Sequence, residues 1–118
     1  NATGALHNAR IEVVPRYSCP PVLNSPREAA LARAAAEAVV GSGHLVEMDY
    51  PSMGGEDFSF YQEKIPGCYV RFGARRAEQP EIPLHNARFT VDEDVLKIGA
   101  VFYERVARAT IDELRAKS

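Results

Sequence analysis

The sequence predicts an α/β fold with a largely parallel sheet. Segments with the apolar alternation of β-strands take turns along the chain with segments that have the apolar periodicity of α-helices, an order typical of β–α units. The chain has 118 residues, of which 46% are hydrophobic and 25% charged, a globular composition that suits one domain. It begins without methionine or a helix cap, enters a strand-like run at once and closes in a polar helix end, so we expect a C-terminal fragment of a longer protein.

The first half of the chain predicts a strand, an extended passage and a helix. Residues 9–14 alternate, with Ile11 and Val13 on one face and charged residues on the other, as in a half-buried strand. Three prolines in residues 15–24 exclude a helix and favour an extended passage that joins two domains or follows a surface.

The clearest helix signal covers residues 25–41. Ser25 is a good N-cap, Pro26 suits the first helical position and Glu28 completes a capping box. Gly41 and Gly43 supply the stop. The many alanines favour close packing of this helix against a sheet. The expected inner side consists of Leu31, Ala35, Ala38 and Val39.

The second half predicts two short strands, at residues 44–48 and 68–73, separated by a short helix at residues 56–65. A long final helix follows, with Thr90 as its cap, Glu93 in a second capping box, and an end near Leu114. Its amphipathic stripe is formed by Val91, Val95, Ile98, Phe102, Val106 and Ala109.

Composition excludes several classes of function. Basic and acidic residues are intermixed and the net charge is −2, so the chain lacks the basic stripe of a nucleic-acid-binding protein. No apolar run approaches the roughly 18 residues of a membrane span, and no signal peptide is visible. Two cysteines, Cys19 and Cys68, are too few for a secreted disulfide scaffold, so we expect reduced thiols and a cytoplasmic protein.

Two loops carry the residues that chemistry could use. In a parallel sheet, the loop at residues 50–59 and the loop at residues 82–89 would both lie at the carboxyl edge, which suggests that Glu56, Asp57 and His85 approach one another. Each loop also has a plainer interpretation. The first could be a glycine turn followed by acidic residues at a helix start, and His85 could be a loop histidine without a role.

Other candidates for chemistry are weaker. His7 and His44 are not spaced as metal-binding partners of His85, and no motif with two zinc ligands in a fixed spacing is present. Cys68 lies within an apolar strand, where a core position is the more common role than that of a nucleophile.

Taken together, four motifs resemble a known family. PPVLN, SMGGEDFSFY, IPGCYVRFG and PLHNARFTVDEDVLKIGA occur in this order. Their order and spacing resemble the C-terminal segment of the zinc-dependent amidohydrolases, which include hippurate hydrolases, N-acyl-amino-acid hydrolases and auxin-conjugate hydrolases, within the wider aminoacylase and carboxypeptidase group. The resemblance covers residues 9–116, nearly the whole chain.

The resemblance implies a fold and a site. Residues 1–22 would be the end of an inserted lid or dimerisation domain with its return crossing, and residues 23–118 the C-terminal portion of a three-layer α/β hydrolase domain. His85 would be one ligand of a two-metal centre. The centre would hold zinc, or else manganese, nickel or cobalt, and we expect it to be empty in a fragment. Ala87 stands where the family usually has proline. The implied pocket residues are Gly54, Gly55, Glu56, Asp57 and Asn86.

The resemblance also implies a function. The parent enzyme would hydrolyse the amide bond of N-acyl or aroyl amino acids or small peptides. Its general-base glutamate and its other metal ligands would lie upstream, so this segment would hold no catalytic residue and be inactive alone. The alternative is a self-standing, non-enzymatic α/β module that binds a small molecule or dimerises. A fragment that lacks the upstream part of its domain exposes strand edges and apolar helix faces. We therefore expect a homo-oligomer.

Overall fold

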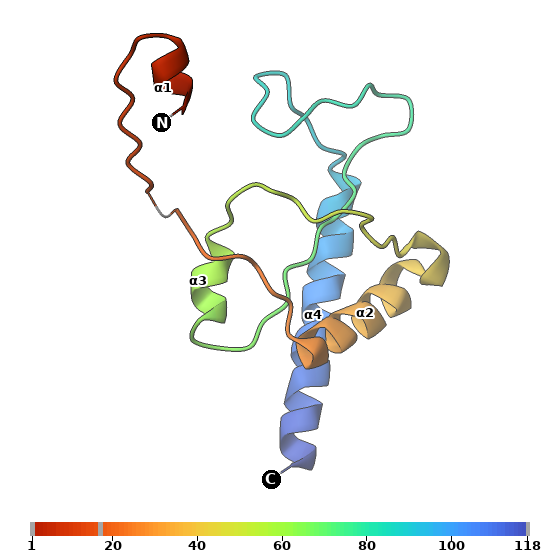
Figure 1. The fold of residues 1–118 in the computed structure, drawn as a ribbon. Helices are drawn as coiled ribbons and strands as arrows, with labels where there is room; N and C mark the ends of the chain where they lie inside the picture. The colour runs from red at the N-terminus through yellow and green to blue at the C-terminus, as the bar shows by residue number, and fades with distance from the viewer. Residues whose placement is uncertain (1, 17, 118) are drawn as a thin grey trace.

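The computed structural model describes residues 2–16 and 18–117, and Figure 1 shows their arrangement. A central body carries two crossing helices, and an arm at the N-terminal end leads away from it to a separate short helix. The Cα radius of gyration is 19.9 Å, whereas a compact domain of this length has about 13–14 Å. The helices of the described residues are α1 (Ala2–Leu6), α2 (Pro26–Val40), the 3₁₀ turn η1 (Ser42–His44), α3 (Phe58–Gln62) and α4 (Asp94–Ala116).

The core lies where α2 packs against α4. Ala32 and Ala35 of α2 and Phe102 of α4 are the buried hydrophobic side chains of the described residues. Alanine has no side chain beyond Cβ, so it lets the two helices approach closely around the Phe102 ring. The ring of Phe72 meets Phe102 edge-on at 5.3 Å between centroids, which suits the quadrupoles of both rings.

Helix α2 begins and ends as the sequence predicted, but its cap differs. Gly41 ends the helix with a φ of 83°, a conformation that glycine adopts without strain. The capping box predicted for Ser25 and Glu28 is wrong, because the Ser25 side chain makes no cap hydrogen bond. Its Oγ instead accepts a hydrogen bond from the N–H of Gly67 at 3.2 Å, and Glu28 pairs with Arg27.

The long helix α4 starts later than predicted. It begins at Asp94, so Thr90 is not its cap, and Glu93 makes no side-chain cap hydrogen bond. Asp92 Oδ1 instead accepts a hydrogen bond from the N–H of Asp94 at 3.2 Å, so a side chain still satisfies a free N–H at the start of the helix. The helix ends at Ala116, close to the predicted Leu114.

Two further helix predictions need correction. Helix α3 covers Phe58–Gln62, which is shorter than the predicted residues 56–65. Helix α1 was not predicted, because its few residues carry no cap and no apolar stripe. It is closed by a hydrogen bond from the N–H of Ala9 to the carbonyl of Gly4 at 2.9 Å.

The predicted strands are not paired into a sheet within the described residues. Residues 9–14 and 68–73 have irregular structure, and the strand predicted at residues 44–48 begins inside η1. A strand is defined by hydrogen bonds to a neighbour, so a segment can have the sequence of a strand without forming one when no neighbour is present. The parallel α/β arrangement therefore stays a prediction.

Side-chain amides take the place of a strand partner beside α3. The amide of Asn24 donates to the carbonyl of Tyr69 at 3.1 Å and its Oδ1 accepts from the N–H of Tyr69 at 2.8 Å. Gln62 does the same for Leu23, with its Oε1 at 3.0 Å from the N–H and its Nε2 at 2.9 Å from the carbonyl. We call this pair the amide clamp. It holds the segment before α2 against α3 and against the segment that begins at Gly67.

Candidate functional site

The first candidate loop is residues 54–57, here called the GGED loop, which leads into α3. Gly55 lies under the thiol of Cys19, and a Cβ at Gly55 would stand only 2.9 Å from that Sγ. Such a distance is shorter than any real contact of this kind, so a side chain at this position would push Cys19 away. The loop therefore lies against the extended segment before α2, with the Cys19 side chain in close contact with it.

Glu56 is tied to its surroundings on both its side chain and its backbone. Its Oε1 accepts from the N–H of Phe58 at 3.2 Å. That hydrogen bond, followed by the interaction of the carboxylate with the hydroxyl of Tyr69, lowers the pKa of Glu56, and the same interaction raises the pKa of Tyr69. The backbone carbonyl of Glu56 accepts from the hydroxyl of buried Ser59 at 2.6 Å.

Asp57 follows Glu56 in the chain but has a different environment. Its side chain is exposed at the start of α3 and makes no cap hydrogen bond there. The sequence placed both acids in one pocket without separating them. In the structure, Glu56 is engaged within the protein and Asp57 faces solvent.

His85 occupies the tip of the second candidate loop. The N–H of Asn86 donates to the carbonyl of Pro83 at 3.3 Å, which closes a turn with His85 as its third residue. The φ of His85 is 69°, in the left-handed region that glycine prefers and that histidine enters less readily. Asn86 braces the turn, because its Oδ1 accepts from the N–H of Arg88 at 2.9 Å. The imidazole is exposed to solvent.

These residues do not make a complete metal site. Within residues 2–16 and 18–117, no group of three or more His, Cys, Asp or Glu side chains is placed to hold an ion. Zinc needs three or four protein ligands, so His85 alone could supply only one of them. Glu56, Asp57 and His85 are not gathered into such a group, although the sequence suggested that they approach one another.

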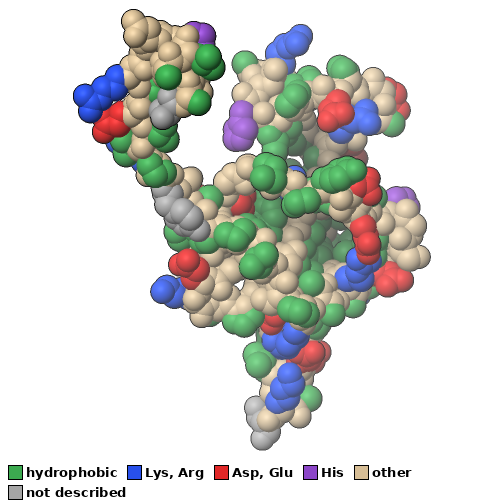
Figure 2. All heavy atoms as spheres, in the orientation of Figure 1, with side chains coloured by type: hydrophobic (Ala, Val, Ile, Leu, Met, Phe, Trp, Pro, Cys, Tyr) green, Lys and Arg blue, Asp and Glu red, His purple; other side chains and the backbone are tan. Residues whose placement is uncertain are grey.

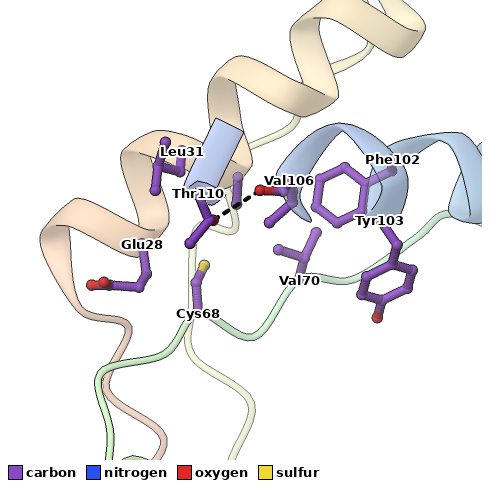
Figure 3. Close-up of a pocket in the computed structure, with 9 residues that line it drawn as sticks. Glu28, Leu31, Cys68, Val70, Phe102, Tyr103, Val106 and Thr110 are labelled. Atoms are coloured by element: carbon purple, nitrogen blue, oxygen red, sulfur yellow. Dashed lines mark hydrogen bonds between the residues drawn. The ribbon is translucent and has the colours of Figure 1, made fainter. Parts of the chain in front are cut away.

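A hollow of about 150 Å³ lies elsewhere, between α2, α4 and the segment after Gly67 (Figure 3). Sequence reasoning missed it, although the apolar spacing along both helices could have indicated a shared groove. Burial, followed by the nearby charge of Glu28, raises the pKa of the Cys68 thiol, which keeps it protonated and a poor nucleophile. The lining residues are Glu28, Leu31, Ala32, Cys68, Val70, Phe102, Tyr103, Val106 and Thr110.

Tyr69 is the other site residue that the sequence did not indicate. It lies one position from Cys68 in an apolar run, and nothing in that pattern connects it to Glu56, from which it is thirteen residues distant. As for membranes, the helices in the described part of the chain are all too short or too polar to cross one.

Comparison with known proteins identifies the family. Residues 6–109 match peptidase family M20/M25/M40. The chain belongs to this family, and the resemblance to amidohydrolases of the aminoacylase and carboxypeptidase group is confirmed. No solved structure matches the chain.

Individual relatives show how much of a family member the chain covers. It is 34% identical over 82 residues to the N-acetylcysteine deacetylase of Bacillus subtilis. These aligned residues cover 70% of the chain and 20% of that protein. It is 38% identical over 81 residues to the IAA-amino acid hydrolase ILR1-like 4 of Arabidopsis thaliana, covering 68% of the chain and 18% of that protein. A putative glutamate–cysteine ligase 2-3 of Rhodococcus jostii is 42% identical over 95 residues, which are 80% of the chain and 12% of that protein. The chain thus spans a fifth or less of the length of these relatives.

Proposed function

We propose that the chain is the C-terminal part of a metal-dependent amidohydrolase that cleaves the amide bond of N-acyl or aroyl amino acids. The observation that carries the proposal is the family match over residues 6–109. Two relatives support the substrate class, because their names describe removal of an acetyl group from N-acetylcysteine and hydrolysis of an IAA–amino acid compound. On this proposal, residues 23–118 complete a three-layer α/β domain whose sheet forms only with the rest of the enzyme.

The proposal gives this chain two tasks. His85 is held at an exposed turn, where it can reach an ion whose remaining ligands belong to the rest of the enzyme. The divalent ion would be zinc, or else manganese, nickel or cobalt, all of which suit a site of histidine and carboxylate ligands. The GGED loop and Asn86 form part of the wall beside the substrate. The general base lies outside this chain, so the isolated chain does not catalyse.

A chimeric enzyme tests the proposal. In the Bacillus subtilis N-acetylcysteine deacetylase, the stretch of 82 residues that aligns with this chain is replaced by the corresponding residues from this chain. We expect the chimera to hydrolyse N-acetylcysteine and the isolated chain with added zinc, manganese, nickel or cobalt to be inactive. Hydrolysis by the isolated chain would contradict the assignment of the general base to another part of the enzyme.

The role of His85 is tested within the same chimera. We expect His85→Ala to lower both the bound metal and the activity by at least about 100-fold, since even partners of metal ligands cost 10–100-fold. His44→Ala is the matched control, because His44 is also exposed and its imidazole Nδ1 lies at 2.8 Å from the carbonyl of Val40, far in sequence from the loop of His85. Equal metal content and activity in the two variants would exclude His85 as a ligand and leave the non-enzymatic module as the better interpretation.

A further inference from the structure

We propose that the amide clamp positions the GGED loop, and that Gln62 is the positioning residue on which this depends. The inference rests on the proposed function, which makes the GGED loop part of the wall beside the substrate. It goes further because it names a residue outside the loop that sets where this wall stands and that acts on substrate binding through the loop.

Gln62 engages both N–H donors and the oxygen of its side-chain amide. Its Oε1 accepts from the N–H of Leu23 at 3.0 Å, and its Nε2 donates to the carbonyls of Leu23 at 2.9 Å and Gly67 at 3.0 Å. One side chain thus gives Leu23 the pair of hydrogen bonds that a residue in a neighbouring strand would give. Since Gln62 is the last residue of α3, this end of the helix is fastened to two segments, one before α2 and one that begins at Gly67.

The two segments that Gln62 holds are also bonded to each other. The N–H of Ser25 donates to the carbonyl of Gly67 at 2.9 Å, and the Oγ of Ser25 accepts from the N–H of Gly67 at 3.2 Å. The amide of Asn24 bonds both the N–H and the carbonyl of Tyr69, at 2.8 and 3.1 Å. Because Ser25 directly precedes α2, these bonds tie the position of α3 to the helix that holds the core.

Helix α3 carries this position to the GGED loop. The N–H of Phe60 donates to the carbonyl of Asp57 at 3.0 Å. The carbonyl of Glu56 accepts from the N–H of Ser59 at 3.2 Å and from its hydroxyl at 2.6 Å. The last two residues of the loop are therefore bonded to the first turn of α3. A helix of five residues is too short to be stable alone, so its placement depends on the contacts at its ends.

Close packing along α3 supports these hydrogen bonds. The ring of Phe58 lies against Gly67, where a Cβ would stand 3.1 Å from the ring carbon Cζ. The same ring lies 5.7 Å from the ring of Tyr69, between centroids. Gly54 and Asp57 remain exposed on the loop, so a loop placed by α3 still presents these two residues to a ligand.

The turn that carries His85 is held by a separate set of contacts. The N–H of Asn86 bonds to the carbonyl of Pro83, and the N–H of Arg88 bonds to the side chain of Asn86. Among the described residues, no hydrogen bond joins this turn to the amide clamp. Loss of the clamp should therefore weaken substrate binding and leave metal binding by His85 unchanged.

The test replaces Gln62 with methionine. Methionine has a similar length and helix propensity but no N–H and only a weak acceptor, so Gln62→Met removes the three hydrogen bonds and keeps the bulk of the side chain. Gln79→Met is the matched control, because Gln79 is also half-buried and its hydrogen bonds are made by its backbone. Its N–H donates to the carbonyl of Arg76 at 3.1 Å, and its carbonyl accepts from the side chain of Arg75 at 2.8 Å.

The first readout is hydrogen exchange, measured on the isolated chain. We expect Gln62→Met to lower protection of the Leu23 amide at least about tenfold, because its acceptor is removed, and of the Phe60 amide at least about threefold, because α3 loosens from the loop. Gln79→Met should leave both amides within about twofold of the unmodified chain. Unchanged protection of the Phe60 amide in Gln62→Met would overturn the proposal even if the Leu23 amide exchanged faster. An equal fall in Gln79→Met, or an unmodified chain that protects neither amide, would also overturn it.

The second readout is the steady-state kinetics of the chimera. We expect Gln62→Met to raise KM for N-acetylcysteine at least about threefold, with unchanged metal content and with kcat within about twofold. A substitution that only destabilised the fold would lower the apparent kcat, since less enzyme is folded, and would leave KM unchanged. That result, or equal kinetics in Gln62→Met and Gln79→Met, would overturn the proposal. A chimera without any activity would contradict the proposed function, while the exchange measurement would still decide whether the amide clamp holds the loop.

Discussion

At the residue scale, the interaction between Glu56 and Tyr69 should make the GGED loop sensitive to pH at both extremes. The pKa of Glu56 is lowered in the folded chain, so its contribution is complete above the ordinary carboxyl range and is lost as the pH falls through the lowered value. The pKa of Tyr69 is raised, so its contribution is complete below the ordinary tyrosine range and is lost as the pH rises through the raised value. We therefore expect the loop to be most stable between these two ranges.

Two measurements check this expectation. Protection of the Phe58 amide, corrected for intrinsic exchange, should fall at acidic pH in the unmodified chain and change less with pH in Glu56→Gln, which has no carboxyl to protonate. The ultraviolet absorbance of phenolate, taken as the difference between the unmodified chain and Tyr69→Phe, should give a pKa for Tyr69 that moves down towards the ordinary value in Glu56→Ala. An unchanged Tyr69 pKa in that variant would show that the two side chains do not interact in solution.

The backbone at His85 gives a second expectation. A residue other than glycine in the left-handed region costs about 1–3 kcal/mol, and a β-branched residue is the least suited to it. We expect His85→Gly to leave the free energy of unfolding within about 1 kcal/mol, because relief of strain offsets the greater freedom of glycine in the unfolded chain. His85→Val should be less stable than His85→Gly by about 1–2 kcal/mol. Chemical denaturation measures the free energy of unfolding of both variants. Equal stability of His85→Gly and His85→Val would mean that this turn is not formed in solution.

The sequence predicted the loops of the site better than the partners within them. Gly55 and His85 could be placed in loops because glycine, proline and asparagine mark turns locally. The interaction of Tyr69 with Glu56 and the contact of Cys19 with Gly55 join residues far apart in the chain, and only tertiary structure sets such pairs. The role of His85 as a metal ligand stays a prediction from family resemblance, since the described residues gather no group of three or more possible ligands.

At the element scale, the two long helices are confirmed in the structure, whereas the predicted strands stay predictions, for a physical reason. The hydrogen bonds of α2 and α4 lie within each helix, so a local pattern is enough to place them. The segments predicted as strands need neighbours, and in residues 68–73 the backbone of Tyr69 is bonded by the side chain of Asn24 and not by a neighbouring strand. The inner side of α2 was only partly predicted, because Ala35 is buried as expected but Ala38 is exposed and Ala32 takes its place.

The α2–α4 contact can be tested by overpacking it. Ala35 is 7% exposed against α4, so Ala35→Leu adds methylene groups where the helices meet and should cost about 1–3 kcal/mol in the free energy of unfolding. Ala34 is the matched control, because it lies one position earlier in the same helix and is exposed. Ala34→Leu should change the free energy of unfolding by less than about 0.5 kcal/mol. Thermal unfolding followed by circular dichroism compares the two, and equal melting temperatures would show that α2 does not pack on α4 in solution.

At the scale of the whole molecule, the chain has little core for its length. Its extents are 65 × 45 × 23 Å, and the buried hydrophobic side chains of the described residues are confined to the contact of α2 with α4. Figure 2 shows hydrophobic side chains spread over the surface of the body and along the arm. Exposed apolar area of this extent favours association with another surface, either the rest of an enzyme or a second copy.

Helix α4 offers the clearest site for such association. Leu96 and Tyr103 are 66% and 68% exposed, and their spacing of seven residues places them on one side of the helix. We expect the isolated chain to self-associate, so the mass measured by light scattering should rise with concentration. Burying a large apolar side chain contributes about 1.5–3 kcal/mol, so two such side chains on each copy can support a weak dimer.

Charge substitution on this side of α4 should reverse the association. We expect Leu96→Glu together with Tyr103→Glu to give a monomer at concentrations where the unmodified chain associates, because a carboxylate cannot be buried cheaply without a partner. Lys97→Glu is the control, since it also adds negative charge to α4 but replaces a residue that is exposed and bonds only to Asp94 in a surface pair at 3.0 Å. Circular dichroism verifies that helix content is unchanged in all three proteins. An unmodified chain that remains monomeric would show that its exposed apolar side chains do not suffice for association. Loss of association in Lys97→Glu as well would assign the effect to net charge and not to Leu96 and Tyr103.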